Sequence, residues 1–548
     1  MSEGSPADYL NTDHVEADLA RHSARGSAVS VATQVVRFLL SVASTMVLAR
    51  LLDARDFGLL AVAFASIGVF GLIKDAGFAS ATVQQAAIDH RQVSTLFWAS
   101  AGLSAVVSLL IAGLAPLLGW FYGDPRVVTV VLALAAVPFI DGLGMQHMAI
   151  LSRRMEFPLL SAIDAASMLA AFATAVTIAW RGGGYWALVG QEIAGAVVGT
   201  LLLWMLCGWR PGRPSRAAGI GRMVRFGLNV SAVRIVTHLT NNLDTVFVGR
   251  FTGVAPAGLY DRAFRLLTLP FQLLTGPLGS VAVPALSRLQ GDPQRYRDFY
   301  RAWTRLVFAF SMPLVVFLFV DAKAAIIAIL GARWAGMVPL YRALAPAAFI
   351  GRTGFVAGWI YTSTGRSDRH LRWVAMVFPA MLLGYAIGVR WGALGVALAH
   401  SIVSCLSWYP GIVYCCRTAP VRPRDVVEQM ILPGVLSIAA GLILHGLVRS
   451  GLPAVRPLTL NLALHALLYG LVYLGLWATF PSGRRMLREF LSQLALLRRR
   501  GEGPVEVEGP AEVSTSPRTA VRFASVDSGA VDRQPAPGFR RSDDRGPT

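Results

Sequence analysis

The chain has 548 residues, of which 55% are hydrophobic and only 15% are charged, and its mean hydropathy is +0.55. A soluble domain cannot bury so much apolar surface, so the composition indicates a membrane protein. The formal net charge of +19 would suggest nucleic-acid binding in a soluble protein, but here the arginines lie in short loops between apolar runs, which is typical of membrane orientation. We therefore expect membrane lipid, and no nucleic acid, among its partners.

The chain begins with a polar arm. Residues 1–26 carry several acids and lack the basic start and short apolar core of a signal peptide. We predict that this arm is cytoplasmic and that the first apolar run after it remains as a membrane anchor.

Apolar stretches of about 20 residues, each enough for one crossing, follow along most of the chain. They predict an all-α polytopic membrane protein with about 14 transmembrane helices. Six form an N-lobe over 27–207, six form a C-lobe over 224–415 after a cytoplasmic linker over 208–223, and two additional helices occupy 427–480. The predicted spans lie near 27–49, 57–76, 93–119, 127–147, 158–180, 185–207, 224–248, 256–285, 302–321, 336–362, 371–389, 392–415, 427–448 and 457–480.

The C-terminal residues differ in composition from the spans. Arginines surround leucines over 481–500, which predicts a basic amphipathic segment that anionic lipid would attract to the inner leaflet. Residues 501–548 are rich in Pro, Gly, Ser and mixed charges, so we expect a disordered cytoplasmic tail.

The connections between spans are asymmetric in charge. Alternate connections, counted from the N-terminal arm, carry about 21 Lys and Arg before the C-terminal segment, against about ten on the other side. The positive-inside rule then places both termini in the cytoplasm of a bacterial cell, with the protein in its inner membrane.

The chain contains an internal repeat. Arg50 and Gly58 recur 200 positions later as Arg250 and Gly258, and apolar residues around them match in the same phase. With six crossings in each half, the two repeats are parallel. Duplicated membrane halves that move about a shared midplane site are a common design of transporters, so transport is the first hypothesis.

Enzyme motifs are scarce. Gly182, Gly183 and Gly184 lack the context of a phosphate-binding loop, and the histidines of the apolar spans show no metal-ligand spacing. The outward connections are also too short to assemble an external active site. We therefore predict that the protein is not an enzyme and has no catalytic residue, metal or cofactor, while coupling to H⁺ or Na⁺ stays open.

Two predicted helices carry a polar stripe. Polar residues three or four positions apart share one face of a helix, and the stripes of the first and seventh spans are related by the repeat. At about 1.5 Å per residue, Arg37 and Arg234 lie near the bilayer midplane, and Arg352 in the tenth span adds a third deep cation. We expect the stripes to line a polar cavity; they comprise Gln34, Arg37, Ser41 and Thr45 in the first span and Arg234, His238, Asn241 and Thr245 in the seventh.

The deep arginines admit two interpretations. Each could pair with an acid (Asp141, Asp164, Glu192 or Asp244) and lock helices together. As a group, however, the deep arginines outnumber the acids on their own spans. A cationic cavity that is not neutralised favours an anion such as phosphate or pyrophosphate, which Arg binds in a bidentate way. Asp141 and Asp244 are then candidate charge partners or coupling acids.

Three segments carry a family resemblance: VLARLLDARDFGLLAVA from Val47, LSRRMEFPLL from Leu151, and LDTVFVGRFTGVAPAGLYDRAFRLLTLP from Leu243 to Pro270. They resemble the polysaccharide flippases (Wzx and WzxC-like lipopolysaccharide biosynthesis proteins) of the multidrug/oligosaccharidyl-lipid/polysaccharide exporter superfamily, over roughly residues 22–480. The resemblance implies two lobes around a central cationic cavity. The cavity cations would here be Arg37, Arg234, Arg262, Arg265 and Arg352.

The resemblance also implies a function. Such a protein would move undecaprenyl-pyrophosphate-linked oligosaccharide between leaflets by alternating access, for exopolysaccharide, capsule or O-antigen synthesis, alongside a polysaccharide polymerase or export machinery. The nearest alternative is a cation-coupled multidrug exporter of the same superfamily, which should need an acidic cavity. A membrane glycosyltransferase or polymerase would need a catalytic acid cluster on a sizeable external loop, which the sequence lacks.

Overall fold

The computed structural model describes residues 36–75, 78–85, 88–215, 238–240, 242–417, 419–450, 457–481 and 483–484. Within these ranges every regular element is a helix, as the sequence predicts. Ten helical stretches are long and apolar enough to cross a membrane, and one of them, Ser367–Cys416, has 50 residues and holds two helices. The chain is therefore a multi-pass membrane protein.

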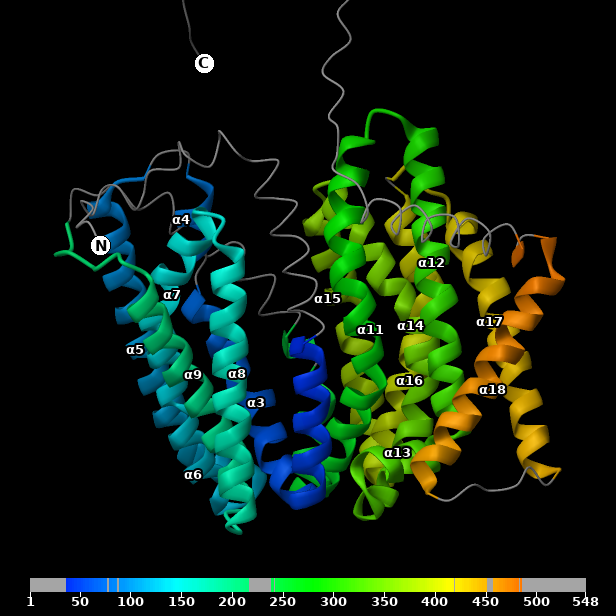
Figure 1. Ribbon diagram of the computed structural model, residues 1–548, viewed down its shortest axis with the longest axis horizontal. Helices are drawn as coiled ribbons and strands as arrows, with labels where there is room; N and C mark the ends of the chain where they lie inside the picture. The colour runs from blue at the N-terminus through cyan, green and yellow to red at the C-terminus, as the bar shows by residue number, and fades with distance from the viewer. Residues whose placement is uncertain are drawn as a thin grey trace, which may run out of the picture. The chain divides into compact units, whose positions relative to one another are not determined.

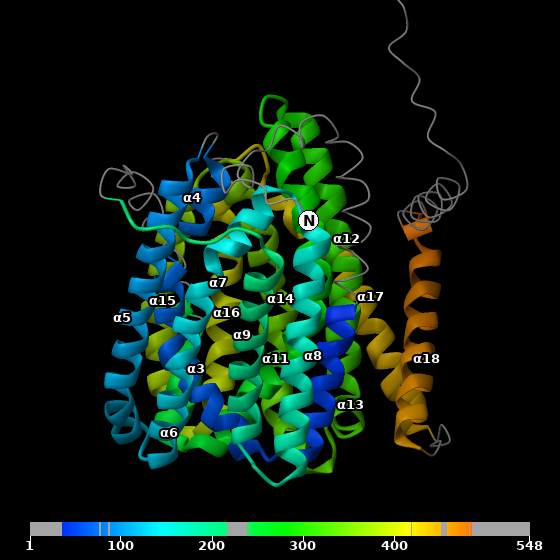
Figure 2. The ribbon, with the colours of Figure 1, turned by 60° about the vertical axis from the view of Figure 1, so that its left-hand side comes forward.

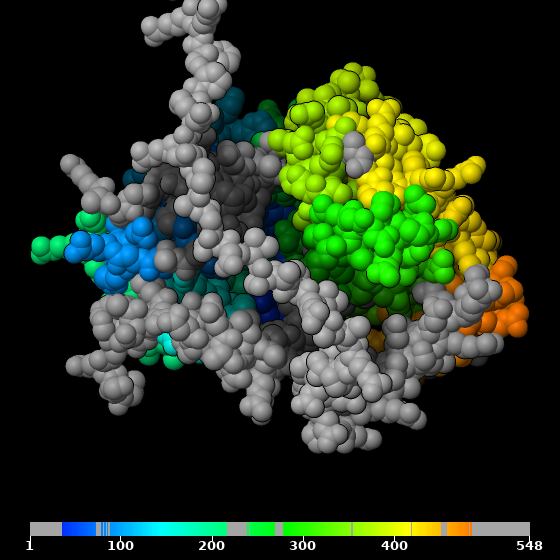
Figure 3. Space-filling model, turned by 90° about the horizontal axis from the view of Figure 1, so that it is seen from above, coloured from blue at the N-terminus to red at the C-terminus, as the bar shows by residue number. Residues whose placement is uncertain are grey.

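The helices form two bundles, which touch most extensively through α3 and α11 (Figures 1 and 3). The first bundle, blue to cyan in the figures, holds helical residues 36–51, α3 (Ala54–Asp75), α4 (Phe78–Gln84), α5 (His90–Tyr122), α6 (Pro125–Leu134), α7 (Ala136–Arg153), α8 (Phe157–Trp180) and α9 (Trp186–Leu206). The second bundle, green to orange, holds helical residues 242–252, α11 (Val254–Arg288), α12 (Pro293–Val320), α13 (Ala322–Leu330), η3 (Ala332–Met337), α14 (Val338–Ser363), α15 (Ser367–Gly388), η4 (Val389–Trp391), α16 (Gly392–Cys416), α17 (Pro423–Arg449) and α18 (Leu458–Thr479).

The predicted spans match the observed helices closely where the structure describes them. For example, the prediction of 93–119 corresponds to α5, and the predicted additional pair corresponds to α17 and α18, which pack against each other and against α12 (Figure 2). The number of about 14 helices stays a prediction. The N-terminal arm, the second half of the linker (216–223), the start of the first and seventh spans, and residues 485–548 of the basic segment and tail lie outside the described residues.

Two features differ from the sequence prediction. The fourth span is divided into α6 and α7 at Ala135, because Pro138 has no N–H to donate to the carbonyl of Leu134, where α6 ends. The predicted loop after the ninth span is instead α13 and η3, whose short apolar run is long enough to pack but too short to cross a bilayer.

The connection between α5 and α6 shows how the turns are built. Gly123 ends α5 with a left-handed φ of 67°, and Asp124 caps α6 by accepting a hydrogen bond from the Arg126 backbone N–H at 3.0 Å. The Arg126 side chain also donates to both carboxylate oxygens of Asp124, at 3.0 and 2.6 Å. These bonds hold the pKa of Asp124 below its ordinary value and leave this residue buried.

The two bundles meet where α3 crosses α11, and the repeat governs this contact. Both helices begin at repeat-related residues, Ala54 and Val254. A methyl group at Gly58 would overlap the carbonyl oxygen of Val254, and one at Gly258 would overlap the carbonyl oxygen of Ala54. The glycine of each repeat therefore contacts the equivalent backbone carbonyl of the other repeat, as in a two-fold interface. Only glycine permits so close an approach of the two helices.

Side chains on both sides reinforce this crossing. Arg50 Nη2 donates to the Ala328 carbonyl at 2.9 Å, and the indole N–H of Trp334 donates to the Ala49 carbonyl at 2.8 Å. The Trp334 ring also meets Phe57 edge to face, with 5.3 Å between ring centroids. The first bundle is thus fixed to α13 and η3 at the end of the molecule where α3 and α11 begin.

Candidate functional site

Arg37, in the helix of residues 36–51, is the first predicted cation that the structure describes. Its Nη1 donates to Asp164 Oδ2 of α8 at 2.9 Å, and the two side chains are 46% and 53% exposed. Both groups therefore keep surface that is open to other partners. Ser41 and Thr45, on the same helix face, are half-buried.

Arg262 and Arg265 share one carboxylate on α11. Asp261 accepts from Arg262 Nη2 at 3.0 Å and from Arg265 Nε at 2.8 Å. Arg262 also lies over the ring of Phe57, 4.5 Å from its centroid, and so reaches the first bundle. Sequence reasoning missed Asp261 as a partner, although its separation of four positions from Arg265 is the spacing at which opposite charges meet on a helix.

Arg265 is the most exposed of these charges, at 56% of its side chain. Among the described residues, its hydrogen bonds to Asp261 use Nε alone. Glu192 of α9, in the first bundle, interacts electrostatically with Arg265 of the second bundle and with Asp141.

Asp244 is buried, with 2% exposure, and its described partners are neutral groups and an imidazole. Oδ2 accepts from the Tyr260 hydroxyl at 2.8 Å and lies 3.7 Å from His400 Nδ1, while Oδ1 accepts from the backbone N–H of Thr245 at 2.7 Å. The Tyr385 hydroxyl lies 2.8 Å from the same His400 nitrogen. The sequence favours a packed or hydrogen-bonded role for His400, because the histidines show no metal-ligand spacing, and nothing in a helix period relates it to Asp244.

The other predicted residues are placed as follows. His238 packs its ring against Gly68 of α3, and Thr245 is buried beside Asp244 rather than open to a cavity. Gln34, Arg234 and Asn241 lie outside the described residues, as does the side chain of Arg352, whose backbone lies in α14.

The described part of the site is therefore mixed in charge. Arg37 has a carboxylate of the neighbouring helix α8 within hydrogen-bond distance, and Arg262 and Arg265 share one on their own helix, so the charge of these three arginines is partly balanced. Arg37 and Arg265 nevertheless keep exposed guanidinium groups, which suit a phosphate oxygen. No group of three or more metal-ligating side chains occurs in the ranges that the structure covers.

A family model described as "Polysaccharide biosynthesis protein" matches residues 47–339. The lipopolysaccharide biosynthesis protein WzxC of Escherichia coli (strain K12) is 26% identical over 442 residues, which is 77% of this chain and 88% of that protein. The teichuronic acid biosynthesis protein TuaB of Bacillus subtilis (strain 168) is 24% identical over 378 residues, 68% of this chain and 78% of that protein. These matches confirm the resemblance expected from the sequence.

Solved structures share the fold. The lipid II flippase MurJ in an inward closed conformation matches with a TM-score of 0.66 and 12% identity, over 83% of this chain and 98% of that one. An inward-facing multidrug resistance MATE transporter of the MOP superfamily matches with a TM-score of 0.54 and 14% identity, over 71% and 98%. The fold alone does not distinguish lipid-linked substrates from drugs. The family model, however, covers more than half of the sequence and so shows the family. This chain belongs to the polysaccharide biosynthesis protein family.

Proposed function

We propose that this protein translocates a lipid-linked oligosaccharide across the bacterial inner membrane by alternating access, for exopolysaccharide, capsule or O-antigen synthesis. The observation that carries the proposal is the crossing of α3 and α11, where two repeat-related halves meet through repeat-related glycines. Two such halves can rock about this contact while a site between them changes the side to which it opens. Family membership supplies the polysaccharide substrate.

The substrate we propose is an undecaprenyl-pyrophosphate-linked glycan. Arg37 and Arg265, with Arg234 and Arg352, would hold the diphosphate, while the polyprenyl chain stays in lipid and the sugars cross in a hydrated space. A polar headgroup crossing bare hydrocarbon would lose its hydrogen bonds to water at a prohibitive cost. If ions drive the cycle, Asp141 and Asp244 are the embedded acids that would bind H⁺ or Na⁺; a polysaccharide polymerase or export machinery would receive the product.

We propose further that both termini are cytoplasmic. In that orientation α3 and α11 begin at the periplasmic side, so their crossing closes the outer end of the transport path. The described conformation would then be open to the cytoplasm, which is where a lipid-linked glycan is assembled before export.

Cysteine labelling tests this orientation. Cysteine at Ser367, the exposed first residue of α15, should resist a membrane-impermeant thiol reagent added to intact cells, whereas cysteine at Arg181, exposed between α8 and α9, should react. Asp124 looks suitable in the sequence but is a poor reporter, because it is buried against Arg126. The unmodified chain gives the background from its four native cysteines. Labelling at Ser367 and protection at Arg181 would reverse the topology and the direction of export.

Loss of the protein tests the function itself. A deletion strain should accumulate a lipid-linked glycan on the inner leaflet and lose the corresponding surface polysaccharide, and the full chain should restore both. If the protein were a glycosyltransferase or polymerase, a shortened or unpolymerised glycan would be found instead. Unchanged lipid-linked glycan together with a loss of cationic drug efflux would favour the multidrug alternative.

A further inference from the structure

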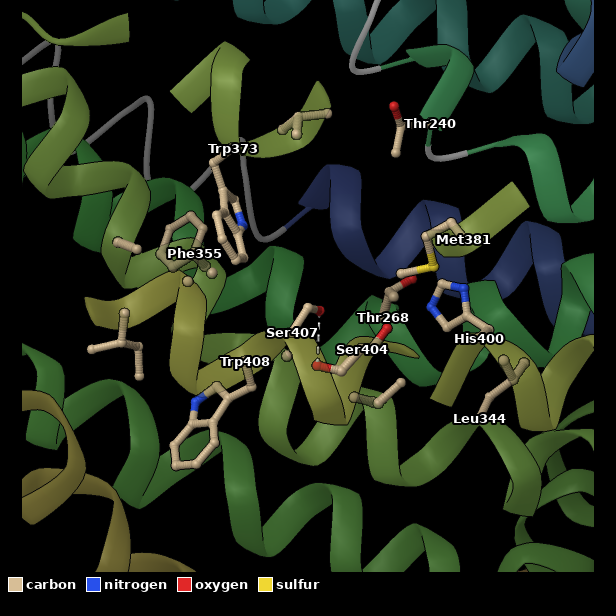
Figure 4. A pocket seen from close by; sticks show the side chains of 18 of the residues that line it. Thr240, Thr268, Leu344, Phe355, Trp373, Met381, His400, Ser404, Ser407 and Trp408 are labelled. Carbon is tan, nitrogen blue, oxygen red and sulfur yellow. Dashed lines mark hydrogen bonds between the residues drawn. The ribbon is translucent and has the colours of Figure 1, made fainter. Parts of the chain in front are cut away.

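A cavity of about 580 Å³ lies inside the second bundle, between α11, α14, α15 and α16, apart from the arginine site described above. Among the described residues that line it there is no Asp, Glu, Lys or Arg. A cavity of this size without formal charge suits an uncharged organic group of a few rings. Figure 4 shows that Trp373 and Phe355 lie on one side, Met381 and His400 on the other, and Thr268, Ser404 and Ser407 between them.

Aromatic rings form one part of the lining, and their positions are well fixed. The Trp373 ring stacks on Tyr414 with 5.7 Å between centroids, and it lies so close to Gly411 of α16 that a methyl group there would come within 2.9 Å of the ring. Tyr361, which also lines the cavity, stacks on His370 with ring centroids 5.0 Å apart. Flat rings held in this way offer apolar faces to the C–H face of a pyranose.

Hydrogen-bonding groups form the other part. Thr268 donates to the Phe264 carbonyl at 2.9 Å and Ser407 donates to the Ser404 carbonyl at 3.3 Å, so both hydroxyl oxygens can still accept. The indole N–H of Trp408 is buried and has no hydrogen-bond partner among the described residues. A buried donor without a partner is unfavourable by about 1–3 kcal/mol. Because this nitrogen has no exposed surface, a ligand hydroxyl would reach it only after the Trp408 side chain shifts.

The chemistry of this cavity differs from that of a second, more apolar cavity in the same bundle. The second cavity has about 550 Å³, lies between α12, α14 and α17, and is lined mainly by aliphatic residues and phenylalanine, with Arg342 and His445 as its polar residues. A polyprenyl chain offers no hydrogen bonds and suits such walls. The first cavity instead matches a sugar, which combines apolar C–H faces with a rim of hydroxyls. Its walls carry indole N–H groups, hydroxyls and imidazoles beside aromatic faces.

The cavity also adjoins two predicted phosphate-binding arginines. Phe264, which lines it, directly precedes Arg265 on α11, and Gly351, which also lines it, directly precedes Arg352 on α14. Consecutive Cα atoms are about 3.8 Å apart. The backbone of both arginines therefore lies beside the wall of the cavity, and successive side chains on a helix point in different directions.

We propose that this cavity is a binding subsite for uncharged pyranose rings of the glycan, the ones nearest the diphosphate. The inference rests on the proposed function and adds to it a specificity site within the second bundle. Trp373 supplies the stacking face and Trp408 a hydrogen bond, so sugar recognition and phosphate recognition reside in separate residues.

Binding to the full-length protein in lipid nanodiscs tests the proposal, with two probes: undecaprenyl diphosphate, and the lipid-linked glycan extracted from the deletion strain. We expect the unmodified protein to bind the glycosylated lipid at least tenfold more tightly. Trp373→Ala and Trp408→Ala should lose most of that preference while binding undecaprenyl diphosphate normally, and Trp373→Phe, which keeps a flat ring, should retain it. Trp391→Ala, at a site 70% exposed in the same bundle, is the matched control.

The outcomes separate the two proposals. If the unmodified protein binds neither probe, the proposed function fails. If it binds both equally, or if the tryptophan variants bind both as the unmodified protein does, the sugar subsite alone fails. Equal weakening of both probes by Trp373→Ala would mean that the polyprenyl chain occupies the cavity, which also overturns the subsite.

Discussion

Replacing Arg37, Arg265 or Arg352 with Gln is expected to reduce export of the lipid-linked glycan roughly tenfold to hundredfold without reducing membrane abundance. Each change removes a charge-assisted hydrogen bond to phosphate worth about 1.5–3 kcal/mol while nearly preserving side-chain length. Lys should restore part of the export, because it keeps the charge but loses the bidentate fork. Surface polysaccharide, inner-leaflet glycan and membrane abundance should be measured together.

The ion pairs supply the controls. If Arg37 only fixes its helix to α8, Arg37→Gln should lower the amount of folded protein, and Asp164→Asn in the same molecule should restore it. Arg372→Gln removes an exposed pair with Asp368, with side chains 67% and 60% exposed, and should leave export unchanged. Normal export by all three Gln variants at normal abundance would remove the cationic site from the mechanism.

The fold was largely predictable, because a helix that crosses a membrane must show its length and polarity in consecutive residues. The repeat was predictable for a related reason. Arg50 and Gly58 recur in a sequence where apolar matches are common, and the structure shows that the glycine fills a position where any side chain would collide with backbone. Pro138 could have predicted the division of α6 from α7. The division was missed because the whole span is apolar, which predicts a single helix.

The candidate site was only partly predictable, because its partners lie on different helices. Arg37 and Asp164 are 127 positions apart, and Asp244 and His400 meet only through the packing of α16. Counting acids along the span of Arg37 therefore left out Asp164, which lies on another helix. The aromatic cavity was also hidden, since Trp373 and Trp408 each look like ordinary residues of an apolar helix until α15 and α16 are paired.

Leucine at Gly58 or at Gly258 is expected to abolish export almost completely. At either position the first atom of a side chain would collide with a backbone carbonyl of the other bundle, and backbone cannot move aside as a flexible side chain can. Overpacking of this kind destabilises the contact by about 1–3 kcal/mol or more, and 3 kcal/mol would shift the closing equilibrium roughly hundredfold. The two bundles should still fold, because each keeps its own packing.

Cross-linking measures the closure directly. Asp53 and Arg333 form an ion pair of 3.3 Å beside the crossing, so cysteines at both positions should be joined by a short bifunctional thiol reagent in an otherwise unmodified chain. The cross-link between these two positions should be lost in either leucine variant. Gly102→Leu, where a new side chain meets nothing within 4 Å, should leave both cross-linking and export intact.

Because the contact is related by the repeat, the two leucine variants should fail in the same way and to a similar degree. Gly58 meets Val254 of the second half and Gly258 meets Ala54 of the first, so either variant separates the same pair of helix starts. A severe defect from one variant and full export from the other would show that only one of these contacts closes the path. The symmetric crossing would then be a trace of gene duplication rather than the contact about which the two halves move.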